Sequence, residues 1–122
     1  MCQEFGIEND GIPQIAFYFA GGIGNSGSVC GAVVGAVMAI GLKRGRAASM
    51  VEMLGNLAFA GDFRRRFEAE MGNIDCRDLT GLDLSTVEGR SNLLDSDVAQ
   101  TVCFPAVAAA YRIAVDMLNE QC

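Results

Sequence analysis

The feature that most restricts how this chain can fold is an uninterrupted apolar segment, Val29–Leu42. It is 14 residues long and contains no charged residue. A helix that is apolar on every side belongs in the centre of a protein, so the segment predicts a buried central helix with Ser28 as its N-cap. The small residues of this segment recur at three- and four-residue spacing, which lets a neighbouring helix approach closely: Gly31, Ala32, Gly35, Ala36 and Ala39.

Apolar periodicity predicts a second long helix over residues 47–71, either continuous or broken near Gly61. The glycine and asparagine at positions 72 and 73 are expected to end it. Two apolar stripes are expected to face the core, one in each half of this helix: Met50, Met53, Leu54 and Leu57, and then Phe59, Phe63 and Phe67.

Shorter elements are expected on either side of these two helices. A first helix begins near Gly11, because Pro13 suits a first helical turn. Residues 73–92 contain two glycines and scattered charge, so we expect a structured loop with at most one helical turn near residues 77–79.

The C-terminal part predicts two further helices. A short one begins at Ser91 or Asp95 and is interrupted at residues 103–105, and a last helix runs from Pro105 to about Leu118. No segment alternates with the period of two that strands require. We therefore predict an all-α protein, a single domain over residues 1–122 in which four or five helices form a compact bundle around the small-residue-rich central helix. One face of the last helix is expected to be apolar: Val107, Tyr111, Ala114 and Leu118.

Histidine is absent from the sequence, and this restricts the available chemistry. It excludes histidine ligation of zinc or haem and histidine-dependent nucleophilic catalysis. Nine Lys and Arg against 15 Asp and Glu give a net charge of −6, so we expect no nucleic-acid partner. Thiols, carboxylates and backbone amides are the reactive groups that remain.

The sequence also bears on compartment. Residues 1–6 include no basic residue and no long apolar run, so no signal peptide is expected. The apolar segment at 29–42 is shorter than the roughly 20 residues that a membrane span needs. The five cysteines are an odd number without a CxxC pair, so they show no zinc-ribbon or thioredoxin signature, and in a reducing cytoplasm they are not expected to form a static disulfide framework. We therefore expect a cytoplasmic protein without a membrane span.

Three of the five cysteines are candidate reactive thiols. Cys30 is expected in the first turn of the central helix, where the helix dipole stabilises a thiolate, and Cys103, near the start of the last helix, shares this argument. The alternative for both is a small buried core residue. Cys76 is expected in a loop between charges of both signs, so the direction of its pKa shift stays open. Cys2 and Cys122, at the ends of the chain, are expected to be incidental thiols.

A glycine-rich segment precedes Cys30 and matches the pattern Gly22-x-Gly24-x-x-Gly27. This is the spacing of a dinucleotide-binding loop, but such a loop needs a parallel strand after its helix, and here a further helix is predicted. We therefore expect a tight turn, whose exposed backbone N–H groups could hold a small anion.

A resemblance to a known family is carried by the glycine run together with the cysteines. Residues 19–36, FAGGIGNSGSVCGAVVGA, continuing to residues 41–45, GLKRG, resemble the signature of small bacterial and archaeal redox-active proteins named for a C_GCAxxG_C_C cysteine pattern. Residues 74–81, IDCRDLTG, are similar to the second block of that family, and Cys103 with Pro105 is similar to its last cysteine segment. The resemblance covers roughly residues 15–118.

The resemblance implies a redox role and no particular substrate or cofactor. Two features of the family are not matched, because the expected upstream helix with its cysteine is missing or shortened and Leu82 stands where the family tends to have a cysteine. Covalent haem is not expected, since the chain has neither CxxCH nor histidine. Residue by residue, the resemblance carries over Cys30, Cys76 and Cys103.

Three hypotheses for function follow. The first is a thiol redox protein in which Cys30 is the reactive thiolate and either Cys76 or Cys103 is its disulfide partner, acting with a redox partner that the sequence does not identify. The second is a metal or iron–sulfur site with Cys30, Cys76 and Cys103 as ligands. The third is a helical interaction module, a homodimer that covers an exposed apolar face.

Overall fold

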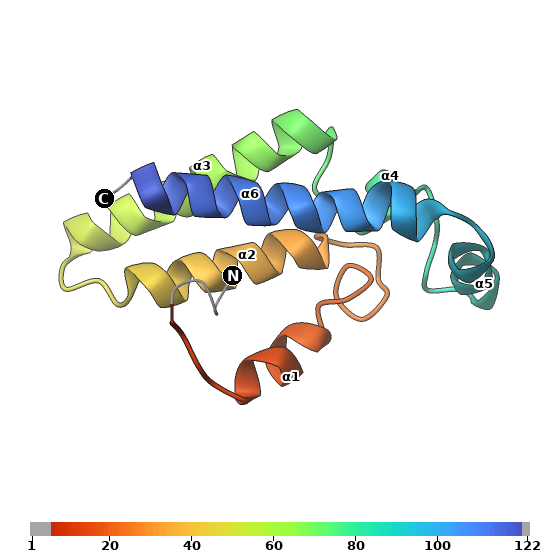
Figure 1. Cartoon of the computed structure of the whole chain (residues 1–122), viewed down its shortest axis with the longest axis horizontal. Helices are drawn as coiled ribbons and strands as arrows, with labels where there is room; N and C mark the ends of the chain where they lie inside the picture. Colours follow the sequence, from red (N-terminus) through yellow and green to blue (C-terminus); the bar gives the residue numbers. More distant parts are fainter. Residues whose placement is uncertain (1–5, 121–122) are drawn as a thin grey trace.

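The computed structural model describes residues 6–120, which fold into six α-helices and one π-helical turn. It confirms the predicted all-α fold, and within residues 6–120 the only β-type pairing is an isolated bridge between Val29 and Asp75. Figure 1 shows α2, α3 and α6 lying lengthwise beside one another, with α1 set apart on the α2 side and α4 and α5 near one end. The elements in chain order are α1 (Gly11–Phe17), α2 (Gly31–Arg44), α3 (Met50–Met71), α4 (Cys76–Thr80), α5 (Val87–Asp95), η2 (Ala99–Cys103) and α6 (Phe104–Glu120).

The core lies between α2, α3 and α6. Phe63 and Phe67 of α3 are fully buried, and Met117 of α6 is almost so. The predicted central helix, α2, contacts α1, α3 and α6, and it buries Val33 and Ile40. The helix with the most buried residues is α6, which packs against both α2 and α3.

Small side chains allow α2 and α6 to pack closely. Ala36 of α2 belongs to the same buried cluster as Ala106, Ala110 and Ala114 of α6. An alanine at the contact brings two helix axes closer than a larger side chain would allow, so more backbone surface is buried per residue. The predicted role of the small residues in α2 is therefore consistent with the packing of these two helices.

The long helix α3 is continuous through Gly61 and begins with a capped first turn. The Ser49 hydroxyl accepts a hydrogen bond from the Glu52 N–H at 3.1 Å, and the Glu52 carboxylate accepts one from the Ala48 N–H at 3.1 Å. Two N–H groups at the start of the helix are thereby satisfied. Gly72 ends α3 in the left-handed conformation, as predicted.

The two apolar stripes predicted for α3 have different environments. The phenylalanine stripe faces the core, with Phe59 partly buried beneath the Arg44 guanidinium at 4.2 Å from its ring centroid. The stripe in the first half of α3 is exposed instead, and the prediction that it faces the core is wrong. We call this surface the α3 row; the exposed fractions of its large side chains are 66% for Met50, 81% for Val51, 40% for Met53, 58% for Leu54 and 61% for Leu57.

The predicted break before the last helix is also wrong. The chain passes from η2 directly into α6, and the N–H of Phe104 donates to the carbonyl of Ala99, five residues back. Pro105 has no N–H to donate, and its ring would clash with the carbonyl four residues earlier in a regular α-helix. The wider π-turn relieves that clash, so the helix continues.

Residues 73–92 contain more helix than predicted. The single turn near residues 77–79 is present as α4, but a second helix, α5, already begins at Val87. The Thr86 hydroxyl caps α5 by accepting from the Gly89 N–H at 2.9 Å. The other expected cap is wrong as well, since Cys30 and not Ser28 is the N-cap of α2.

One segment of the described chain, Ala99–Glu120, is long and apolar enough to cross a membrane by length and composition alone. Its mean hydropathy is 1.4, and 44% of the tested window is buried inside the structure. The core helix of a soluble protein passes the same test. Because α6 packs against α2 and α3, we attribute its apolar character to that packing.

Candidate functional site

The bridge between Val29 and Asp75 brings together two cysteine-bearing segments that are far apart in the sequence. Next to this pair, the N–H of Cys30 donates to the carbonyl of Ile74 at 2.7 Å. The N–H of Cys76 donates to the carbonyl of Ser28, also at 2.7 Å. Each cysteine stands directly after the bridge and at the start of a helix, Cys30 as the N-cap of α2 and Cys76 as the first residue of α4.

The glycine run forms the turn that precedes the bridge. Its φ angle is positive at five consecutive residues, 21–25, and again at Gly27. A Cβ on Gly22 would lie 2.5 Å from the backbone N and O of Ser28, and one on Gly27 would lie 2.9 Å from the Cβ of Arg77. Any other residue at these positions would therefore meet both an unfavourable φ and a steric clash. The glycines allow the turn to pack directly against the two bridge segments.

The backbone of this turn is already hydrogen-bonded to itself. The N–H groups of residues 23–28 all donate to backbone carbonyls of residues 18–23. The expectation that N–H groups of this turn could hold a small anion is therefore wrong for those six groups. The turn is a structural support for the segments that carry Cys30 and Cys76.

Cys30, Cys76 and Cys103 line a single cavity of about 370 Å³, which we call the thiol pocket. Its walls come from the glycine turn, the start of α2, α4, α5 and the junction of η2 with α6. The three candidate cysteines of the sequence are thus brought together, and all three are free thiols. The lining residues are Ala20, Gly21, Asn25, Cys30, Gly31, Ala32, Cys76, Leu79, Thr80, Leu84, Leu93, Cys103 and Val107.

The surroundings of Cys76 and Cys103 differ from those predicted. Cys76 is buried, with 8% of its surface exposed, although a loop position beside charges is usually exposed. Cys103 lies at the end of η2 and not at a helix N-terminus, because the helical segment already begins at Ala99. The dipole argument for Cys103 is therefore wrong, while Cys30 does stand at the start of a 14-residue helix.

Burial determines the protonation of two of the thiols. It raises the pKa of Cys76 above the ordinary value for a thiol, and the nearby Cys30 and Cys103 raise it further, while a hydrogen bond with Thr80 acts in the opposite direction. Burial also raises the pKa of Cys103, to which Cys30 again contributes. Both groups are consequently neutral thiols near pH 7. Cys30 is the one cysteine of the three that contributes to the raised pKa of both others.

Thiols are the only side chains in this pocket that suit a soft metal or a cluster. Within residues 6–120, however, no group of three or more Cys, Asp and Glu side chains is arranged to hold a metal ion. The metal-site hypothesis for the three cysteines therefore stays a prediction. Cys2 and Cys122 lie outside the described residues.

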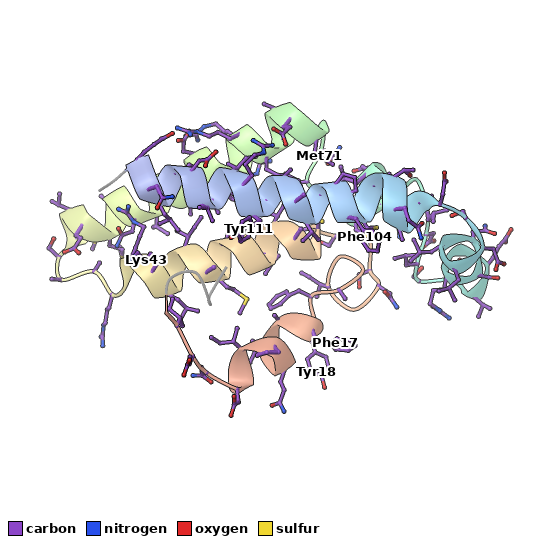
Figure 2. The ribbon with its side chains drawn as sticks, in the orientation of Figure 1. Phe17, Tyr18, Lys43, Met71, Phe104 and Tyr111 are labelled. Atoms are coloured by element: carbon purple, nitrogen blue, oxygen red, sulfur yellow. The ribbon has the colours of Figure 1, made fainter. Side chains whose placement is uncertain are left out.

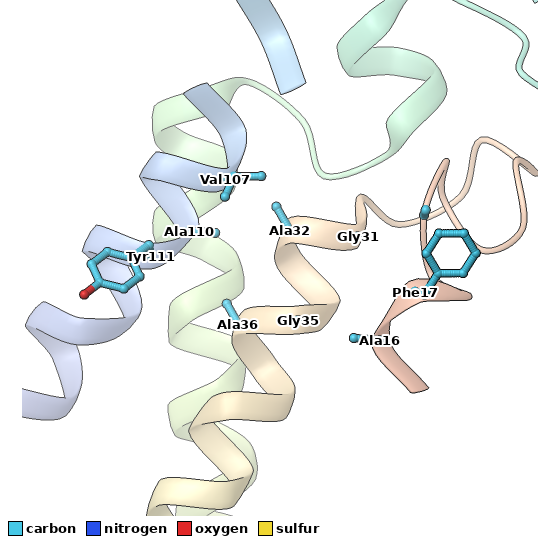
Figure 3. Close-up of a pocket in the computed structure, with 10 residues that line it drawn as sticks. Ala16, Phe17, Gly31, Ala32, Gly35, Ala36, Val107, Ala110 and Tyr111 are labelled. Carbon is cyan, nitrogen blue, oxygen red and sulfur yellow. The ribbon is translucent and has the colours of Figure 1, made fainter. Parts of the chain in front are cut away.

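A second cavity of about 390 Å³ adjoins the thiol pocket and separates α1 from α2 and α6. Figure 3 shows Ala32 and Ala36 of α2 facing this space, with Val107 and Tyr111 on the side of α6. Phe17 lines it from α1. The Phe17 ring meets that of Tyr18 edge to face at 5.7 Å between centroids, and Figure 2 places both rings at the end of α1.

Sequence reasoning missed two pocket residues, Leu84 and Leu93. Leu84 is buried, with 4% exposed, in a segment expected to be a loop, and Leu93 belongs to α5, most of which was not predicted. One sequence signal for α5 was available, because Thr86 stands directly before the helix, where its hydroxyl accepts a hydrogen bond from the Gly89 N–H. Thr at this position before a short polar helix is a common N-cap.

Comparison with known proteins places the chain in a family. The family model described as "Putative redox-active protein (C_GCAxxG_C_C)" matches residues 1–117. No curated protein and no solved structure shows a significant match. The match spans nearly the whole sequence, including the glycine turn and the three cysteines of the thiol pocket. The chain therefore belongs to the C_GCAxxG_C_C family.

Proposed function

We propose that the protein is a thiol-based redox protein in which Cys30 forms a reversible disulfide with Cys76 or Cys103. The observation that carries the proposal is that three cysteines from distant parts of the chain line one pocket. If the cysteines served only as small core residues, nothing would require all three to line the same cavity. Membership of a family described as redox-active supports the same conclusion.

The reaction is a thiol–disulfide exchange. The Cys30 thiolate attacks one sulfur of a substrate disulfide and releases the other sulfur as a thiolate, which takes up a proton. The second cysteine then attacks the mixed disulfide, loses its proton, and releases the remaining substrate thiol. The two cysteines are oxidised by two electrons in total, and the substrate disulfide is reduced to two thiols.

The position of Cys30 supports its role as the shared member of the pair. It contributes to the raised pKa of both Cys76 and Cys103, so it lies within electrostatic reach of each. Cys76 is its diagonal neighbour across the bridge, where Cα atoms in an antiparallel pair are about 7–8 Å apart. A disulfide needs Cα atoms within about 7 Å, so a small backbone shift would be enough to join this pair.

The test uses a Cys2→Ser/Cys122→Ser background, which leaves only the three pocket thiols. The reduced protein is incubated with bis(2-hydroxyethyl) disulfide, and the products are mapped by peptide mass spectrometry. We expect one intramolecular disulfide that contains Cys30. Cys30→Ser should abolish it, and only one of Cys76→Ser and Cys103→Ser should do the same. A disulfide that still forms at full yield in Cys30→Ser would contradict the proposal.

We also propose that the protein is cytoplasmic. A protein whose cysteines cycle between thiol and disulfide suits a compartment where glutathione and thioredoxin keep thiols reduced. Cell fractionation followed by immediate thiol alkylation tests this location. The protein should be found in the cytoplasmic fraction with its pocket thiols reduced, and its recovery from another compartment would contradict the proposal.

A second function, self-association, is favoured by the α3 row. Met50, Leu54 and Leu57 follow the spacing of a helix interface, and Glu52 is the only charged residue among the first 12 of α3. An exposed apolar row of this kind is typical of a protein–protein contact. We propose that the α3 row pairs with that of a second copy of the chain.

Sedimentation at micromolar concentration tests this pairing. The double variant Leu54→Lys/Leu57→Lys should convert a dimer to a monomer without unfolding it, because both side chains are already exposed. Leu94→Lys, on a side chain that is 84% exposed on α5, is the matched control and should stay dimeric. A wild-type protein that sediments as a monomer at these concentrations would overturn self-association.

A further inference from the structure

The thiol pocket is lined without a single charged side chain. None of the residues around this cavity of about 370 Å³ is Asp, Glu, Lys or Arg, and the two hydrogen-bonding side chains apart from the thiols are those of Asn25 and Thr80. The rest of the wall is aliphatic side chain and glycine backbone. A charged ligand entering such a space would lose its hydration and find no opposite charge to replace it.

Two arginines that adjoin pocket residues, Arg77 and Arg90, are committed to other contacts. Arg77 follows Cys76 in sequence, but its guanidinium pairs with the Asp83 carboxylate at 3.2 Å and is half exposed. Arg90 of α5 donates to the carbonyl of Leu84 at 2.9 Å. Neither is among the residues that line the thiol pocket. An anionic substrate therefore has no cation in the pocket to hold it.

From this lining we infer that the thiol pocket selects small, uncharged disulfides as substrates and discriminates against anionic ones such as glutathione disulfide. The inference rests on the proposed thiol redox function and names its substrate class. It also follows from the charge of the whole molecule, because a net charge of −6 disfavours the approach of an anion.

The exchange itself is neutral overall when the substrate is uncharged. The disulfide enters as a neutral molecule, accepts two electrons and two protons from two protein thiols, and leaves as two neutral thiols. No charge has to be buried beyond the thiolate that attacks in the first step. A carboxylate-bearing disulfide would add two fixed charges to the same space at a desolvation cost that nothing in the lining offsets.

Three disulfides of similar size but different charge test the inference. Bis(2-hydroxyethyl) disulfide is neutral, 3,3′-dithiodipropionate is a dianion and cystamine is a dication. The rate of disulfide formation is measured in the Cys2→Ser/Cys122→Ser background at high salt, and each rate is divided by that of the same protein unfolded in urea. We expect the normalised rate with the neutral disulfide to exceed both others by at least tenfold.

Adding a charge at one wall of the pocket should change this preference. Leu93→Lys places a cation in the lining, whereas Leu94→Lys places the same charge on the neighbouring, 84% exposed position of α5. We expect Leu93→Lys to raise the normalised rate with the dianion at least tenfold and Leu94→Lys to change it less than twofold. Leu93→Met, which keeps the wall neutral, controls for altered packing, and circular dichroism checks that each variant is folded.

The outcomes separate the substrate class from the function. If no disulfide oxidises the pocket thiols, the proposed redox function itself is wrong. If all three disulfides form the Cys30 disulfide at equal normalised rates, the redox function stands and the inferred selectivity is overturned. A preference for the dianion in the wild-type protein would overturn it as well.

Discussion

Among individual residues, the three pocket cysteines show how position in the fold changes the chemistry of one side-chain type. Cys76 and Cys103 are held as neutral thiols by burial, and Cys30 stands at the start of a long helix. The sequence suggested similar helix-terminus positions for Cys30 and Cys103. The structure gives them different positions, because Pro105 is accommodated by a π-turn and the helical segment already begins at Ala99, before Cys103.

The raised pKa of Cys76 predicts a loss of stability at high pH. The folded-state pKa of Cys76 lies above the value of 9.0 for a free thiol. Below about pH 9 the thiol is therefore protonated in both the folded and the unfolded chain, and the free energy of unfolding does not depend on its ionisation. As the pH rises further, the unfolded chain ionises first and the free energy of unfolding falls. Urea unfolding measures the free energy of unfolding at pH 7.5 and at pH 10. The decrease between the two pH values should be smaller for Cys76→Ala than for the wild type. An equal loss would show that Cys76 does not contribute.

Two glycines with opposite surroundings give a second prediction. Gly22→Ala should lower the free energy of unfolding by about 1–3 kcal/mol, because its φ is +73° and the added Cβ would clash with Ser28. Gly55→Ala should raise it by about 1 kcal/mol, because Gly55 lies inside α3 with nothing within 4 Å of the added Cβ. Denaturant midpoints of the two variants measure both effects. A shift of the same sign in both would contradict the argument.

Among the helices, two features explain which sequence predictions were confirmed and which were wrong: the hydrogen bonds that cap a helix, and the packing of other helices over its apolar face. The uninterrupted apolar segment correctly predicted α2, and periodicity correctly predicted the buried stripe of α3 that contains Phe63 and Phe67. It could not show that the row around Leu54 has no helix over it, because periodicity defines a face without naming what covers that face. It also missed most of α5, whose polar sequence has little apolar period and depends on the Thr86 cap.

The cap of α5 can be tested directly. Thr86→Ala removes the acceptor of the Gly89 N–H and the donor to the Asp83 carbonyl, so the free energy of unfolding should fall by about 1 kcal/mol. Ser91→Ala, which removes only an exposed hydrogen bond to Asp95, should change it by less than about 0.5 kcal/mol. Because α5 carries Leu93, Thr86→Ala should also speed alkylation of the pocket thiols. Thermal denaturation and alkylation rates measure the two effects.

For the molecule as a whole, the site depends on contacts that no local pattern contains. Cys30 and Cys76 line the same pocket because the bridge between Val29 and Asp75 joins two segments of the chain. One segment precedes α2 in the sequence and the other follows α3. Each cysteine could be identified as a candidate from its neighbours in sequence and from the resemblance. Their convergence on one apolar pocket, together with Leu84 and Leu93, follows only from the packing of helices far apart in the chain.

Oxidation should therefore stabilise the whole molecule. A disulfide from Cys30 to Cys76 or Cys103 would close a loop of several dozen residues in the unfolded chain, which by loop entropy is worth about 4 kcal/mol before any strain is subtracted. The oxidised protein should have a higher urea midpoint than the reduced protein, and Cys30→Ser should show no difference between the two conditions. A lower midpoint on oxidation would indicate that the bond strains the fold more than it constrains the unfolded chain.

The turn of positive φ angles at residues 21–25 has a consequence for how the gene can change. A single base change in a glycine codon yields Ala, Val, Ser, Arg, Cys, Trp, Asp or Glu, and of these only Asp adopts a positive φ with any ease. Asparagine, which suits that conformation better, requires two base changes. In a library of all single substitutions scored for folded protein, the codons of Gly21 and Gly22, where an added Cβ would also clash with neighbouring atoms, should therefore tolerate few replacements, while those of the exposed α3 row accept most. These two codons, which encode part of the support of the thiol pocket, would then change little as the gene drifts.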